Sequence, residues 1–133
     1  MGQTPGQGIA ERVVLDTSVC IEIIKNRQRG ISIANQLFTS EVFLASISTF
    51  ELLLRRTNLG AVEELLREVN LLGFDEKSAR KAAEVKKELN ANGTPIGLSD
   101  IFIAAIALAN GCALATLNVK DFSKIKGLKL VKI

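Results

Sequence analysis

The sequence predicts one α/β domain built on a central parallel sheet of five strands with helices on both faces. Short apolar runs rich in β-branched residues alternate with segments whose apolar residues recur every three or four positions, as strands and helices of βαβ units do. Of the 133 residues, 47% are hydrophobic and 23% charged, an ordinary composition for one globular domain. No linker or repeat divides the chain. We expect a flexible tail over residues 1–11 and a single domain over residues 12–133.

The first half of the chain predicts two strands and four helices. Gly30 separates the first two helices, and Ser48 with Glu51 three residues later has the spacing of a capping box at a helix start. The expected strands cover residues 12–16 and 42–45, and the expected helices cover residues 17–25, 31–38 and 60–69 and the segment that begins at Ser48.

The second half predicts three strands and two long helices. Asp75 is placed to cap the first of these helices, which runs to about Ala91, and Gly93, Pro95 and Gly97 mark a loop. The second helix is almost wholly apolar, begins at Ser99 and ends at Asn110 and Gly111. The expected strands cover residues 71–74, 112–117 and 128–131.

Composition excludes several kinds of chemistry. The chain has no histidine, which removes Ser-His-Asp and Cys-His catalysis and imidazole metal sites. Cys20 and Cys112 form no CxxC pair, and we expect both to be buried apolar residues. No GxxxxGK[ST] or GxGxxG motif occurs. The longest apolar run, residues 101–109, is too short to span a bilayer and the first residues lack a signal-peptide pattern, so we expect a cytoplasmic protein.

Acidic residues fall where predicted strands end. Asp16 ends the first strand, Glu51 lies in the helix after the second, and Asp121 follows the fourth. The carboxyl ends of parallel strands form the usual ligand crevice of such sheets, so these three acids are expected to share one edge. Asp100 begins a helix that leads into the sheet, and its spacing alone predicts the opposite edge. Gathered carboxylates repel one another, and a hard divalent cation such as Mg²⁺ or Mn²⁺ relieves that repulsion.

Each acid also has a purely structural interpretation. Asp16 is placed to cap the helix that begins at Thr17, and Glu51 is placed to be the capping-box partner of Ser48. Asp100 would favour the positive end of its helix dipole, and Asp121 would cap a turn over residues 122–125. The pattern of all four acids together favours the metal site.

The chain resembles PIN-domain proteins, and most of all VapC-type toxins of toxin–antitoxin pairs. The similar stretches are VVLDTSVCIEII from residue 13, SISTFELLLR from residue 46 and PIGLSDIFIAAIALANGCALATLNVKDFSKIKGL from residue 95. The resemblance implies an α/β/α sandwich around a parallel sheet and a ribonuclease that depends on Mg²⁺ or Mn²⁺. It places the family's acidic quartet on Asp16, Glu51, Asp100 and Asp121, and so brings Asp100 to the site.

The resemblance also implies individual roles. Asp16, Asp100 and Asp121 would hold the metal, Glu51 would orient or deprotonate the attacking water, and the supporting polar residues would be Thr17, Thr116 and Asn118. As a toxin-like protein, the chain is expected to pair with an antitoxin and to act on RNA. Its apolar helices also offer a surface for a homodimer or higher homo-oligomer.

Basic residues suggest how RNA would be held. The net charge is +3, and five lysines lie between residues 120 and 133. The candidates for contact with the RNA backbone are Arg27, Arg55, Lys120 and Lys124, although a solvated basic face is the commoner explanation of such clusters.

Three other functions can be compared with these residues. A PIN-fold RNA-binding or RNA-processing protein without catalysis is the main alternative, and retention of all four acids argues against it. A dehalogenase-like phosphatase needs an aspartate two positions after the first, where this chain has Ser18. A structural module acting only through its apolar faces would bind no metal.

Overall fold

A computed structural model describes residues 10–133, so most of the predicted tail at residues 1–11 lies outside the described residues. The described residues form five strands and seven helices, with two helices between successive strands except for the single helix between the last two strands. Their bounds are β1 (Arg12–Leu15), α1 (Thr17–Lys25), α2 (Gln28–Gln36), β2 (Glu41–Ala45), α3 (Ser46–Leu53), α4 (Leu59–Glu68), β3 (Asn70–Leu72), α5 (Glu76–Ala91), α6 (Leu98–Ala109), β4 (Ala113–Ala115), α7 (Val119–Phe122) and β5 (Leu130–Val131).

The five strands form one sheet in the order β3-β2-β1-β4-β5, and every neighbouring pair is parallel. β1 is central, with Leu15 aligned to Leu44 of β2 and to Ala115 of β4. The carboxyl ends of β1, β2 and β4 therefore lie side by side. The predicted five-stranded parallel sheet is confirmed.

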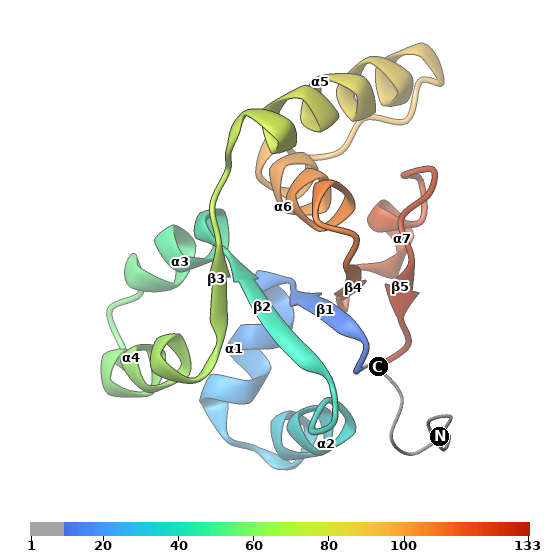
Figure 1. The fold of residues 1–133 in the computed structure, drawn as a ribbon. Helices are drawn as coiled ribbons and strands as arrows, with labels where there is room; N and C mark the ends of the chain where they lie inside the picture. Colours follow the sequence, from blue (N-terminus) through green and yellow to red (C-terminus); the bar gives the residue numbers. More distant parts are fainter. Residues whose placement is uncertain (1–9) are drawn as a thin grey trace, which may run out of the picture.

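Alternate residues of the central strands pack into two separate cores, because successive side chains of a strand point to opposite faces. Val14 packs with the apolar faces of α5 and α6, whereas Val13 and Leu15 pack with α1, α2 and α4. Figure 1 shows the same division, with α5 and α6 on one side of the sheet and α1, α2 and α4 on the other. α3 follows β2 directly and contributes Ile47 to one core and Leu52 to the other. It therefore lies at the carboxyl edge of the sheet.

The expected break at Gly30 is wrong. The chain reverses earlier, where Asn26 ends α1 in the left-handed conformation with φ 52°. Gly30 is a buried residue inside α2, and a Cβ there would lie 2.1 Å from the Glu22 carbonyl oxygen of α1. Glycine is required at this position because it allows the two helices to pack closely.

The expected capping box at Ser48 and Glu51 is also wrong, since α3 already begins at Ser46 and its cap, Ala45, has no side-chain capping bond. By contrast, the Asp75 carboxylate accepts a hydrogen bond from the Ser78 N–H at 2.9 Å and caps α5 as predicted.

The last three strands are shorter than the apolar runs suggested. Within residues 10–133, no helix has the length and apolar character needed to cross a membrane.

Candidate active site at the carboxyl edge of the sheet

Asp16 lies at the centre of the site, directly after β1. Its side chain is 4% exposed and accepts three hydrogen bonds. The donors are the Thr17 N–H at 2.8 Å, the Ser18 hydroxyl at 2.8 Å and the Thr116 hydroxyl at 2.7 Å. The carboxylate also forms the N-cap of α1. Asp16 is therefore both a helix cap and a member of the acidic cluster. These donors fix the carboxylate at the helix N-terminus, where negative charge is stabilised.

Glu51 reaches the site from α3, and both of its carboxylate oxygens are engaged. The Thr17 hydroxyl donates to Oε1 at 2.7 Å, and the Ser99 hydroxyl of α6 donates to Oε2 at 2.9 Å. The buried Ser48 hydroxyl lies 2.8 Å from the Thr17 oxygen. Glu51 is thus held by side chains from two other helices, and Ser48 is a neighbour of Thr17 and not a helix cap.

Asp100 lies at the same edge as the other acids, so the opposite edge predicted from spacing is wrong. A short connection joins the end of α6 to the start of β4, and α6 packs against the sheet. The helix therefore runs antiparallel to the strands. Its twelve residues span about 18 Å, which returns its first turn to the carboxyl edge. The bond between Ser99 and Glu51 joins this turn to α3.

Asp121 comes from α7, where it lies inside the helix and does not cap the turn that follows. The Asn118 side-chain amide donates to its Oδ2 at 3.1 Å, and the Lys124 ammonium lies 3.4 Å from its Oδ1. The hydrogen bond from Asn118 and the charges of Lys124 and Lys120 hold the pKa of Asp121 below its usual value. Thr116 orders this segment, because its oxygen accepts from the Asn118 N–H at 2.9 Å.

The four acids affect one another through their charges. Partial burial and the negative charges of Asp16, Glu51 and Asp121 raise the pKa of Asp100 to about 6. In the described part of the chain, no lysine or arginine pairs with Asp16, Glu51 or Asp100. Across those same residues, no three acidic or cysteine side chains come close enough to form a ready metal-binding group. Basic side chains therefore balance only part of the negative charge of the four acids.

Comparison with known proteins connects this arrangement to a family. The profile of the PIN domain matches residues 13–128, which contain all four acids and the sheet apart from Arg12 of β1 and the short last strand β5. The chain belongs to the PIN domain family.

Relatives of this PIN domain include bacterial VapC proteins. It is 32% identical over 126 residues to "tRNA(fMet)-specific endonuclease VapC" of Salmonella typhimurium, with 90% of this chain and 96% of that protein covered. It is 30% identical to "Ribonuclease VapC1" of Haemophilus influenzae, covering 87% and 93%. Its fold matches the crystal structure of DNA-bound VapBC from Salmonella typhimurium with a TM-score of 0.79 and 26% identity, covering 91% of this chain and 97% of that one.

The basic residues proposed from the sequence are not all near the acids of the PIN domain. Lys124 contacts Asp121, and Lys120 is exposed on α7. Arg55 follows the α3 helix that carries Glu51, and its buried Nε has no hydrogen-bond partner among residues 10–133. Arg27 lies beyond the far end of α1, about 14 Å along the helix from Asp16. Of these four basic residues, Lys120 and Lys124 therefore act on an acid of the site, and Arg55 is connected to it only through α3.

Three hydroxyl groups of the PIN domain were not singled out by sequence reasoning as part of its site. Ser18 donates to Asp16, Ser48 contacts Thr17, and Ser99 donates to Glu51. Ser99 directly precedes Asp100, and Ser18 is two positions after Asp16. Ser48 is one helical turn before Glu51. Proximity to the acids in the chain is the one signal that could have identified them.

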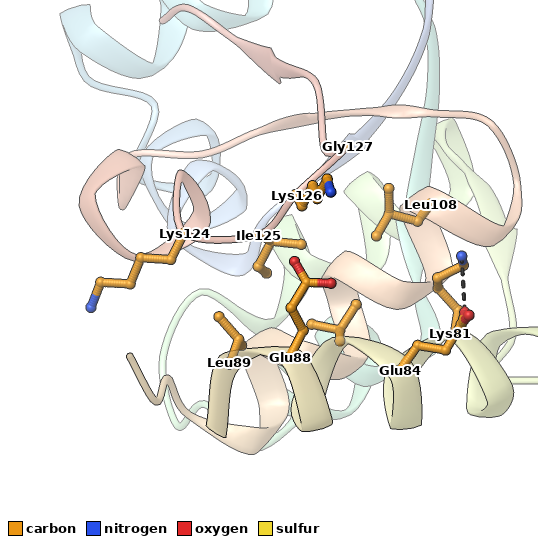
Figure 2. Close-up of a pocket in the computed structure, with 10 residues that line it drawn as sticks. Lys81, Glu84, Glu88, Leu89, Leu108, Lys124, Ile125, Lys126 and Gly127 are labelled. Atoms are coloured by element: carbon orange, nitrogen blue, oxygen red, sulfur yellow. Dashed lines mark ion pairs between the residues drawn. The ribbon is translucent and has the colours of Figure 1, made fainter. Parts of the chain in front are cut away.

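A cavity of about 220 Å³ lies away from the acids, between α5, the end of α6 and the segment after α7 (Figure 2). Its lining combines Leu89, Leu108 and Ile125 with charged side chains, including the ion pair of Lys81 and Glu84 at 3.0 Å. Lys124 also lines it, but Figure 2 shows its side chain extending away from the other lining residues. None of the four acids borders this cavity.

Proposed function

We propose that this PIN domain is a metal-dependent endoribonuclease and the toxin of a VapBC-type toxin–antitoxin pair. The observation that carries the proposal is the convergence on one edge of the sheet of four carboxylates, one at the cap of α1 and three on α3, α6 and α7, where burial and the other three acids raise the pKa of Asp100. Two VapC relatives carry names that state ribonuclease activity, and the matched Salmonella structure contains VapB with VapC. We assign the activity to the domain over residues 12–133.

Asp16, Asp100 and Asp121 are the proposed ligands of a divalent metal, either Mg²⁺ or Mn²⁺. The residues fit such an ion, because the site offers carboxylate oxygens and no imidazole or thiolate, and hard cations prefer oxygen. A bound cation would supply positive charge that offsets both the carboxylates and the phosphodiester. The raised pKa of Asp100 supports this role, since it marks a carboxylate without a counter-ion. The ligands have to close together from their present positions, because no three acids are grouped in residues 10–133.

Glu51 is the proposed acceptor for the proton of the attacking water. Its two oxygens are already held by Thr17 and Ser99, and each oxygen keeps a second lone pair for water. The water oxygen forms a bond to phosphorus, the bond from phosphorus to the 3′-oxygen breaks, and the 3′-oxygen takes up a proton. The products are a 3′-hydroxyl and a 5′-phosphate. Thr116 and Asn118 hold Asp16 and Asp121 in place.

Arg55, Lys120 and Lys124 are the proposed contacts to the RNA backbone beside the site, and Arg27 is a more distant one. Lys124 and Lys120 support this assignment, because their charges act on Asp121 and so lie beside the acids. Contacts of this kind make binding weaken as the salt concentration rises.

Two protein partners are part of the proposal. A VapB-like antitoxin is expected because the matched structure is a VapBC complex. A second copy of the chain is expected on α3, where Phe50 is 63% exposed and Leu54 is 65% exposed one turn later on the same face. Light scattering of the pure protein measures this, and a monomer that persists at high concentration would exclude the homodimer. We also propose that the protein acts on RNA in the cytoplasm.

The test is cleavage of initiator tRNA, the substrate named for the Salmonella relative, with Mg²⁺ or Mn²⁺ and with EDTA. We expect cleavage with metal and none with EDTA. Asp16→Asn is expected to remove cleavage and keep the fold, whereas Glu63→Gln, a change of an exposed acid on α4, keeps both. Wild-type protein that binds RNA but does not cut it with either metal would instead indicate the RNA-binding alternative. Cleavage unaffected by Asp16→Asn would reject the site.

A further inference from the structure

We infer that Ser99 is a positioning residue that holds the Glu51 carboxylate at a fixed separation from Asp100. The inference rests on the proposed ribonuclease function and adds a residue to its site. Ser99 and Asp100 are consecutive residues in the first turn of α6, and the Ser99 hydroxyl donates to Glu51 Oε2 at 2.9 Å. The backbone that carries Asp100 therefore also carries the donor that holds Glu51.

Without this bond, repulsion would move Glu51. The charge of Glu51 is one of the causes that raise the pKa of Asp100, so the two carboxylates lie within reach of each other's field. A glutamate side chain has three rotatable bonds and turns away from a like charge unless it is held. Thr17 holds Oε1 from α1 at 2.7 Å, and Ser99 holds Oε2 from α6. With two anchors on different helices, the plane of the carboxylate is fixed as well as its position.

Hydroxyl groups suit this task better than a charged residue. A lysine or arginine bound to Glu51 would neutralise it and weaken it as an acceptor for the water proton. No ion pair within residues 10–133 includes Glu51. Each neutral hydroxyl uses one lone pair of one oxygen and leaves the carboxylate charged. The arrangement thus restrains Glu51 and preserves its basic character.

Ser99 is not explained as a helix cap. α6 has Gly97 as its N-cap, and no side chain makes a capping bond there. The one hydrogen bond that the Ser99 hydroxyl makes among the described residues goes to α3, forty-eight residues away in sequence. The hydroxyl is therefore used to join two helices and not to begin its own.

The test compares Ser99→Ala and Ser99→Thr with wild type in single-turnover cleavage of tRNA with Mn²⁺. We expect Ser99→Ala to lower the cleavage rate constant about 10- to 100-fold, the range for a misplaced catalytic group, while KM changes less than about twofold. Ser99→Thr keeps the hydroxyl and is expected to recover most of the rate. Ser32→Ala on the exposed face of α2 is the matched control and is expected to match wild type.

A double-mutant cycle shows whether Ser99 acts through Glu51. In a Glu51→Ala background, adding Ser99→Ala is expected to cost less than about twofold, because no carboxylate remains to be held. Side-chain ¹³C relaxation of Glu51 in metal-free protein gives a readout without catalysis, and we expect the side chain to become mobile in Ser99→Ala. An unchanged rate in Ser99→Ala, or an equal loss in both backgrounds, would overturn this inference alone. Absence of cleavage by wild type would instead overturn the proposed function.

Discussion

The Thr116 hydroxyl donates to Asp16 Oδ2 at 2.7 Å across one hundred residues of sequence, and it joins the end of β4 to the end of β1. The same oxygen accepts the Asn118 N–H at 2.9 Å, and the Asn118 side chain holds Asp121. One buried hydroxyl therefore links the first and the last acid of the site. It does so from a position that is 1% exposed, where an unmet hydrogen bond is costly.

Thr116→Val tests this link. Valine has nearly the shape of threonine but no hydroxyl, so it leaves Asp16 without one donor and the Asn118 N–H without its acceptor. Hydrogen bonds to charged groups contribute about 1.5–3 kcal/mol, and we expect the free energy of unfolding to fall by about that amount. Urea denaturation of metal-free protein measures it. Thr116→Ser retains the hydroxyl and serves as the control, and equal losses in the two variants would show that the methyl group matters and not the bond.

Asp100→Asn is expected to stabilise the metal-free protein at neutral pH. The pKa of Asp100 is raised to about 6 in the folded chain, against about 3.9 for an unfolded aspartate. The folded state therefore binds the proton more tightly, which gives a stabilising contribution that is full below about pH 4 and lost as the pH rises through about 6. Asparagine has no charge to repel its neighbours, so it removes this dependence.

Thermal unfolding in EDTA from pH 4 to pH 8 measures the effect. The variant is expected to unfold at a higher temperature than wild type at pH 7.5 and at about the same temperature near pH 4. Saturating Mn²⁺ is expected to reverse the order at pH 7.5, because only wild type keeps all proposed ligands. A variant less stable than wild type throughout this pH range in EDTA would contradict the electrostatic account.

Metal binding is expected to release a proton near pH 6. Asp100 is about half protonated at its pKa of about 6, and a carboxyl group must lose its proton before it binds a cation. The apparent affinity for Mn²⁺ is therefore expected to fall between pH 7 and pH 5, toward a limit of about tenfold per pH unit. Calorimetry in two buffers of different ionisation enthalpy counts the protons. Asp100→Asn provides the control, and a wild type that releases no proton at pH 6 would exclude Asp100 as a ligand.

Sequence alone predicted the sheet and the position of three acids, because strand ends can be read from short apolar runs. VVLD at residues 13–16 places Asp16 after β1 without any knowledge of the rest of the chain. The position of Asp100 could not be predicted from strand ends, because it depends on the direction in which α6 crosses the sheet. The resemblance to the PIN domain brought it to the site, and the reasoning from spacing alone did not.

Helix starts and hydroxyl contacts could not be predicted from local patterns. Ser48 and Glu51 have the spacing of a capping box, yet the chain turns from β2 into α3 at Ser46, and both side chains point to Thr17. Gly30 looked like a helix breaker and is required instead for close packing. In each case a contact between distant segments decided the outcome, and a reading of neighbouring residues carries no information about such contacts.

Lys124→Met is expected to affect metal and RNA in opposite directions. The Lys124 ammonium lies 3.4 Å from Asp121 Oδ1 and is partly exposed, so it acts as a cation where the proposed metal would bind. Its removal is expected to tighten Mn²⁺ binding a few-fold, since a like charge is lost beside the site. RNA binding is expected to weaken, with the slope of log affinity against log salt falling by about 0.7–0.9 if one phosphate contact is lost. Lys126→Met, a change of an exposed lysine two residues later that has no acid partner among residues 10–133, is the control for metal affinity. Weaker Mn²⁺ binding in Lys124→Met would show that this lysine supports Asp121 and does not compete with the ion. An unchanged slope of log RNA affinity against log salt would exclude Lys124 from the RNA contacts.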